Sequence, residues 1–222
     1  MSQYQIGTTQ SRESAVVVNK VLKNTYMLLV LTLAFSALTA GFAMASNAAP
    51  VNIWVMLIGF YGLLFLTHKL ADSAWGLLSV FALTGFMGYT LGPILGYYTA
   101  TANGSQLVMT AMGGTAFIFL GLSAYALISR KDFSFLNGFM MAGFFVILAM
   151  FVANLFLQIP ALQLVLSGAF MLFSSAAILM QTGAIINGGE RNYILATVTL
   201  YVSLYNIFIS LLNLLTAFGG EE

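Results

Sequence analysis

The sequence predicts an all-α, polytopic membrane protein with seven transmembrane helices. Of its 222 residues, 60% are hydrophobic and only 6% are charged, whereas soluble domains hold about 25% charged residues. Seven apolar runs approach or exceed the length of about 20 residues that a helix needs to cross a bilayer. Short polar connections separate these runs, so we expect one helical bundle without an extramembrane domain.

The elements follow from these runs in order. The first 23 residues are mixed and polar, without the charged, apolar and small-residue segments that follow one another in a cleaved signal peptide. We therefore expect the first apolar run to stay in the protein as a membrane span. The chain then divides into a cytoplasmic tail, residues 1–23, a bundle, residues 24–218, and a short periplasmic end, residues 219–222. The predicted spans are Asn24 to Ser46, Val51 to Thr67, Trp75 to Tyr98, Gln106 to Ser129, Asn137 to Leu157, Leu162 to Asn187 and Tyr193 to Phe218.

The charges of the tail and the connections support this count of spans. Every Lys and Arg lies in the tail or in the second, fourth or sixth connection, namely Arg12, Lys20, Lys23, Lys69, Arg130, Lys131 and Arg191. The first, third and fifth connections carry no charge at all. Because basic residues stay in the cytoplasm, we predict a cytoplasmic amino terminus and, after seven spans, a carboxy terminus on the opposite side.

Polar residues follow one face of the last span and one face of the sixth. Spacings of three and four keep the residues of the last span within a sector of about 80°, and those of the sixth span occupy a sector of about 120°. The sets are Thr199, Ser203, Asn206, Ser210 and Asn213 on the last span, and Ser174, Ser175, Gln181 and Thr182 on the sixth. We expect the two stripes to face each other. They indicate either ordinary hydrogen-bonded helix packing or the lining of a polar cavity or gate for an ion.

The third span contains the segment GFMGYTLGPIL, in which Gly88, Gly92 and Gly96 recur at every fourth position. Small residues at this spacing allow two helix backbones to approach closely. Pro93 removes one backbone hydrogen bond and should kink the helix. The segment therefore predicts either a close helix contact or a hinge.

The residue types exclude several classes of function. There is no cysteine, the single histidine, His68, lies in a connection, and no span contains a pair of carboxylates. No nucleophile therefore stands beside a base, and we predict neither an enzyme, a metal site nor a cofactor. The net charge of +1 and the absence of a basic face exclude nucleic acid as a partner.

Four segments together resemble the YccA-like branch of the transmembrane Bax-inhibitor-motif family. They are NKVLKNTYMLLVLTLAFSA, GFMGYTLGPIL, FLNGFMMAGFFVILAMFVANLFLQIPAL and LYVSLYNIFISLLNLL, and the likeness extends from about Asn19 to Phe218. The resemblance implies a bundle whose last helix lies near the centre of the other six, in a bacterial inner membrane. It also implies a modulator that restrains proteolysis of membrane proteins by the FtsH protease, engaged through the tail with Arg12, Glu13, Lys20 and Lys23.

Other branches of this family are described as pH-sensitive calcium leak channels, closed by two aspartates on the sixth and seventh helices. The matching positions here are Gln181 and Ser203, which cannot titrate near neutral pH. This difference argues against an aspartate-based gate and favours the regulator. A leak for calcium or another small ion stays open as the alternative, with the candidate pore or gate residues Gln181, Ser203, Asn206, Ser174, Thr182 and Ser210.

Overall fold

The computed structural model describes residues 2–101 and 103–219, except for the side chains of residues 2–15. The described chain forms seven α-helices, each long and apolar enough to cross a membrane. They are α1 (Ser2–Ala45), α2 (Ile53–Leu70), α3 (Trp75–Thr99), α4 (Gly104–Ser129), α5 (Leu136–Leu157), α6 (Pro160–Ile186) and α7 (Tyr193–Gly219). The predicted all-α fold with seven spans is therefore confirmed.

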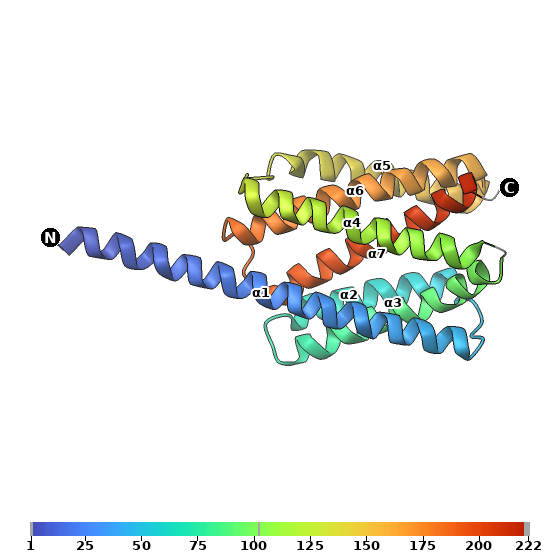
Figure 1. Cartoon of the computed structure of the whole chain (residues 1–222), viewed down its shortest axis with the longest axis horizontal. Helices are drawn as coiled ribbons and strands as arrows, with labels where there is room; N and C mark the ends of the chain where they lie inside the picture. The colour runs from blue at the N-terminus through green and yellow to red at the C-terminus, as the bar shows by residue number, and fades with distance from the viewer. Residues whose placement is uncertain (1, 102, 220–222) are drawn as a thin grey trace.

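Helix α1 differs most from its predicted span, because it begins at Ser2 and not at Asn24. The first proline of the sequence is Pro50, so nothing before it forces the helix to end, and a helix that has formed extends at little cost. The amino-terminal part of α1 reaches beyond the other six helices (Figure 1). The segment before the first span is thus helical.

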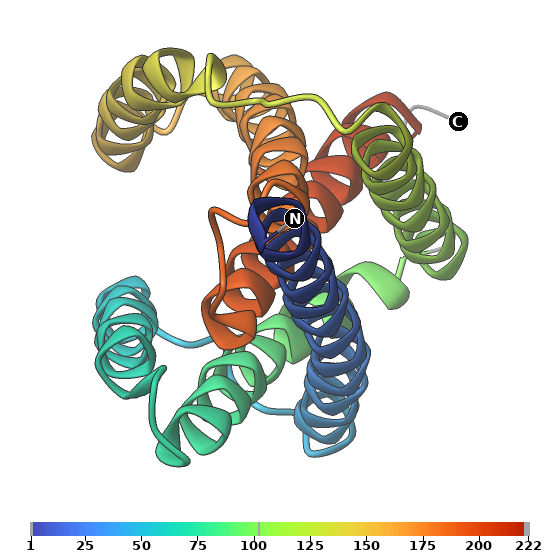
Figure 2. The same cartoon turned by 90° about the vertical axis from the view of Figure 1, so that its left-hand side faces the viewer.

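The last helix occupies the centre of the bundle. It packs against α1, α3, α4 and α6, and it runs between them in the view of Figure 2. In its most apolar 18-residue stretch 56% of the residues are buried, against 6% in α2 and in α5. Helix α2 packs against α3, and α5 packs against α6, so these two helices form the periphery.

The connections lie at two ends of the bundle. Those between α2 and α3, α4 and α5, and α6 and α7 share one end with the amino-terminal part of α1 (Figure 1). We call this the basic end, because it holds Lys69, Arg130, Lys131 and Arg191. At the opposite end lie the three connections without charge and the carboxy-terminal end of α7.

Candidate functional site

The polar residues of the α7 stripe are buried or half-buried, and two of the five bond within their own helix. Ser203 and Ser210 are buried. The hydroxyl of Ser203 donates to the carbonyl of Thr199 at 2.8 Å, and that of Thr199 donates to Leu195 at 3.1 Å. Asn206 is half-buried. The hydroxyls of Ser203 and Thr199 thus satisfy their hydrogen bonds within α7.

The polar residues of α6 behave differently from one another. Ser174 and Thr182 are buried, and Ser175 donates to the carbonyl of Met171 at 2.8 Å. The Nε2 atom of Gln181 and the hydroxyl of Thr182 are also buried, but neither has a hydrogen-bond partner among the described residues. Helices α6 and α7 pack along each other, yet no hydrogen bond in the described part of the chain joins Gln181 to Ser203.

Asn213, at the far end of the α7 stripe, does connect helices. Its Oδ1 atom accepts a hydrogen bond from the hydroxyl of Tyr98 in α3 at 3.0 Å. Its Nδ2 atom donates to the hydroxyl of Ser167 in α6 at 3.4 Å. An amide has both a donor and an acceptor, so one side chain can join three helices.

The glycines of α3 lie against α1. A methyl group on Gly88 would collide with the backbone carbonyl and side chain of Ser36, and one on Gly92 would lie 2.7 Å from the carbonyl of Ala40. A methyl group on Gly96 would meet nothing within 4 Å. Pro93 lies inside the helix, which continues to Thr99. Gly88 and Gly92 therefore allow a close approach of α1 and α3, whereas Gly96 does not take part in it.

Tyr201 is the residue of α7 that most clearly ties it to its neighbours, and the polar spacing did not reveal it. Only 1% of its surface is exposed. Its hydroxyl lies 2.6 Å from the hydroxyl of Ser36 in α1 and donates to the carbonyl of Thr84 in α3 at 3.2 Å. One phenol thus joins α1, α3 and α7 in the middle of the bundle, beside the glycine contacts.

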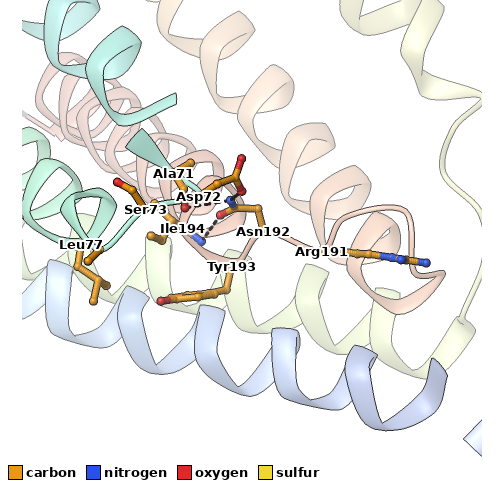
Figure 3. Close-up of a pocket in the computed structure, with 9 residues that line it drawn as sticks. Ala71, Asp72, Ser73, Leu77, Arg191, Asn192, Tyr193 and Ile194 are labelled. Atoms are coloured by element: carbon orange, nitrogen blue, oxygen red, sulfur yellow. Dashed lines mark hydrogen bonds between the residues drawn. The ribbon is translucent and has the colours of Figure 1, made fainter. Parts of the chain in front are cut away.

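Asn192 holds the connections together at the basic end (Figure 3). Its Oδ1 atom accepts from the backbone N–H groups of Ile194 and Leu195, which caps α7. Its Nδ2 atom donates to the carbonyl of Ala71 at 3.1 Å and to the carboxylate of Asp72 at 2.8 Å. Beside it lies an open hollow of about 520 Å³, whose lining includes Arg191 and Tyr193.

The connection between α4 and α5 is fastened to the same end of the bundle. The Nδ2 atom of Asn187 donates to the carbonyl of Lys131 at 3.3 Å. The ring of Phe133, which is buried, fills the space beside Gly183 of α6. Gly188 has a φ of 75°, a left-handed conformation that suits glycine, and so allows the turn between α6 and α7.

Helix α1 passes close to this turn. Val21 forms a buried cluster with Ile185 of α6 and Ala196 of α7, and Thr197 donates to the carbonyl of Thr25 at 3.2 Å. Lys20 and Lys23 are exposed. The side chains of Arg12 and Glu13 lie outside the described residues. The amino-terminal part of α1 is therefore fixed to the bundle from Val21 inward.

Together, the fold and these contacts define a polytopic helical membrane protein whose last helix is buried among the others. The chain belongs to the Bax1-I family, described as inhibitor of apoptosis-promoting Bax1, which it matches over residues 18–220. It is 53% identical over 210 residues, 95% of each chain, to the Escherichia coli K12 protein named modulator of FtsH protease YccA. The resemblance read from the sequence is thereby confirmed.

Two further relatives show the same full-length match. An uncharacterised protein of Pseudomonas aeruginosa is 56% identical over 220 residues, which are 99% of this chain and 98% of the relative. An uncharacterised membrane protein of Vibrio cholerae is 41% identical over 215 residues, 96% of each chain. The family description and the name of the Escherichia coli relative describe an inhibitor and a modulator, and neither names a catalytic activity.

Proposed function

We propose that the chain is an inner-membrane modulator that restrains an FtsH-type protease by direct protein–protein contact. The observation that carries this proposal is the identity of 53% over 95% of both chains with the modulator of FtsH protease. The match covers nearly the whole of both chains, so it is not confined to one segment that the two proteins share. A further relative is named inner membrane protein YccA, which supports the same location for this chain.

The contact that we propose is the amino-terminal part of α1. It extends as a helix beyond the other six (Figure 1), so a partner can reach it without disturbing the bundle. Because Lys and Arg gather at this end, the positive-inside rule places it in the cytoplasm and the carboxy terminus in the periplasm. Arg12, Glu13, Lys20 and Lys23 then face the cytoplasm as candidate contact residues.

Affinity purification in mild detergent tests the partner and the contact together. The full chain should recover the protease, whereas a variant without residues 2–15 should not. In a third variant, residues 2–15 are replaced by a glycine and serine segment of equal length. If this variant also fails to recover the protease, the contact depends on the sequence of residues 2–15 and not only on their length. Full recovery by all three variants would show that α1 is not the contact, and no recovery by the full chain would refute the partner.

Proteolysis itself is tested by the half-life of a membrane substrate of the protease. Overproduction of the full chain should lengthen the half-life, and overproduction of the variant without residues 2–15 should have a smaller effect. Because the truncated variant keeps all seven spans, it also controls for crowding of the membrane by an added protein. An unchanged half-life with the full chain contradicts the proposed restraint.

A second candidate function is a leak for calcium or another small ion. The observation that favours it is the buried polar surface of α6, where Gln181 and Thr182 have atoms without partners among the described residues. Vesicles that contain the protein should then show more ion flux than protein-free vesicles between about pH 6 and 8, a range in which neither Gln181 nor Ser203 titrates. Flux equal to that of protein-free vesicles removes this candidate.

A further inference from the structure

Two buried threonines differ from all the others in how they use their hydroxyl groups. Thr25 of α1 and Thr182 of α6 are fully buried, and neither hydroxyl has a hydrogen-bond partner among the described residues. Every other threonine with a described side chain donates to a carbonyl three or four residues earlier. This local bond is the usual solution for threonine in a helix.

Helix periodicity places the two threonines at the same level of two helices that are in contact. Val21 of α1 and Ile185 of α6 belong to one buried cluster. Thr25 follows Val21 by four residues and Thr182 precedes Ile185 by three, so each lies on the same helix face as its neighbour in the cluster. Since α1 and α6 run in opposite directions, both steps lead away from the basic end, by about 5 Å.

Further polar atoms without partners lie beside this pair. Tyr26 and Gln181 are the chain neighbours of the two threonines, and the Tyr26 hydroxyl and the Gln181 amide nitrogen are buried. The ring of Tyr26 lies 5.9 Å from that of Phe119 in α4, and Ser123, one turn further along α4, has a buried hydroxyl without a partner. Helix α4 thus borders the same level of the bundle.

The chemistry of these groups selects the ligand. Hydroxyls donate and accept hydrogen bonds and an amide nitrogen donates them, but none of the five groups is charged. A calcium or magnesium ion is held by about six or more oxygens, normally with carboxylates among them, and none of these five residues has a carboxylate. An anion requires a positive charge or several aligned donors. Water needs two to four neutral polar partners, and buried water commonly occupies such places.

We propose that water binds between α1 and α6, held by the hydroxyls of Thr25 and Thr182 and bordered by Gln181. A bridging water satisfies both hydroxyls in a region where the bilayer supplies no solvent. This water joins α1 to α6 next to the cluster of Val21, Ile185 and Ala196, on the side of the cluster away from the basic end. The amide of Gln181 is then part of the polar surround of this water and has no need of Ser203.

Substitution by valine, which has the shape of threonine without its hydroxyl, tests the proposal by the sign of its effect. Thr25→Val or Thr182→Val alone leaves the water with one partner fewer and should lower the midpoint of thermal unfolding by about 2 to 5 °C. The midpoint of the double variant should be no lower than that of the less stable single variant, because both substitutions remove the same bridge. The matched control is Thr32→Val, since Thr32 is also fully buried in α1 but donates to Leu29.

Three outcomes would overturn the proposal. If the hydroxyls are buried without water, each valine raises the midpoint, because an unsatisfied polar group has been removed. If they bond within their own helices, each valine matches the Thr32→Val control, and if they act separately, the two effects add. Should the variants fail to fold, a structure of the unsubstituted protein at about 2 Å decides, because density for water must lie within about 3 Å of both hydroxyls.

Discussion

The two sides of α7 handle polar groups in different ways. Toward α1 and α3, the hydroxyl of Tyr201 contacts Ser36 and Thr84 across helix boundaries. The polar stripe of α7 and that of α6 contain more polar residues, but Ser203 donates to its own helix and Gln181 Nε2 has no partner among the described residues. The number of polar residues on a helix face therefore says little about how firmly that face is bound.

The difference has a physical cause in the length of the side chains. A serine or threonine hydroxyl reaches the carbonyl one turn earlier, and that bond costs no helix rearrangement. A tyrosine cannot bond to its own helix in this way, so its hydroxyl must find a partner on another helix or remain unsatisfied. We call α1, α3 and α7 the rigid part of the bundle, because most of the hydrogen bonds that α7 makes with other helices in the described part of the chain go to α1 and α3. Helix α6 packs along α7 mainly through apolar contacts.

The largest effect should come from the glycine contact on the rigid side. Gly88→Ala places a methyl group against the backbone of Ser36, which cannot move aside as a flexible side chain could. We expect a loss of about 3 kcal/mol of unfolding free energy, measured by denaturant titration in mixed micelles. Gly96→Ala is the matched control, since it meets nothing within 4 Å and should be neutral or stabilise the helix by up to about 1 kcal/mol.

Equal effects of the two alanine substitutions would contradict this prediction. They would mean that α3 tolerates a side chain where it lies against α1. The close approach of the two backbones would then contribute nothing to the free energy of unfolding.

Tyr201→Phe should have the next largest effect. It keeps the ring in the core but removes the hydroxyl, so the hydrogen bonds to Ser36 and to the carbonyl of Thr84 are lost. The expected loss is about 1 to 3 kcal/mol. The double variant Tyr201→Phe with Ser36→Ala should be about as stable as Tyr201→Phe alone, because both substitutions remove the same hydrogen bond, and a further loss equal to that of Ser36→Ala alone would show that the pair is not coupled.

Asn192 tests whether the basic end contributes to the rigid part. Asn192→Ala removes both the cap of α7 and the bonds to Ala71 and Asp72, and should cost about 1 to 2 kcal/mol. Asn192→Asp keeps the capping oxygen but loses the donor and faces the carboxylate of Asp72. Amide hydrogen exchange at the start of α7 should therefore rise with alanine and stay low with aspartate, while both variants loosen the connection between α2 and α3.

The helices were predictable because burial in a bilayer imposes one simple requirement, a long apolar run. The Asn192 cap also had a local signal, since an asparagine directly before an apolar run is a common start of a helix. Its contact with Asp72, 120 residues away, had none. Tyr201 was missed for a related reason: within an apolar run it counts as hydrophobic, and its partner Ser36 is 165 residues away.

The smallest effect is expected on the α6 side, at the position that the sequence marked as a candidate gate. Ser203→Ala removes only a hydrogen bond to Thr199 within α7, whose carbonyl can keep its helical partner. The stability should change by less than about 0.6 kcal/mol, the average worth of a polar contact between membrane helices. A loss as large as that of Tyr201→Phe would mean that Ser203 bonds to a group on α6 after all, and the contrast between the two sides of α7 would fail.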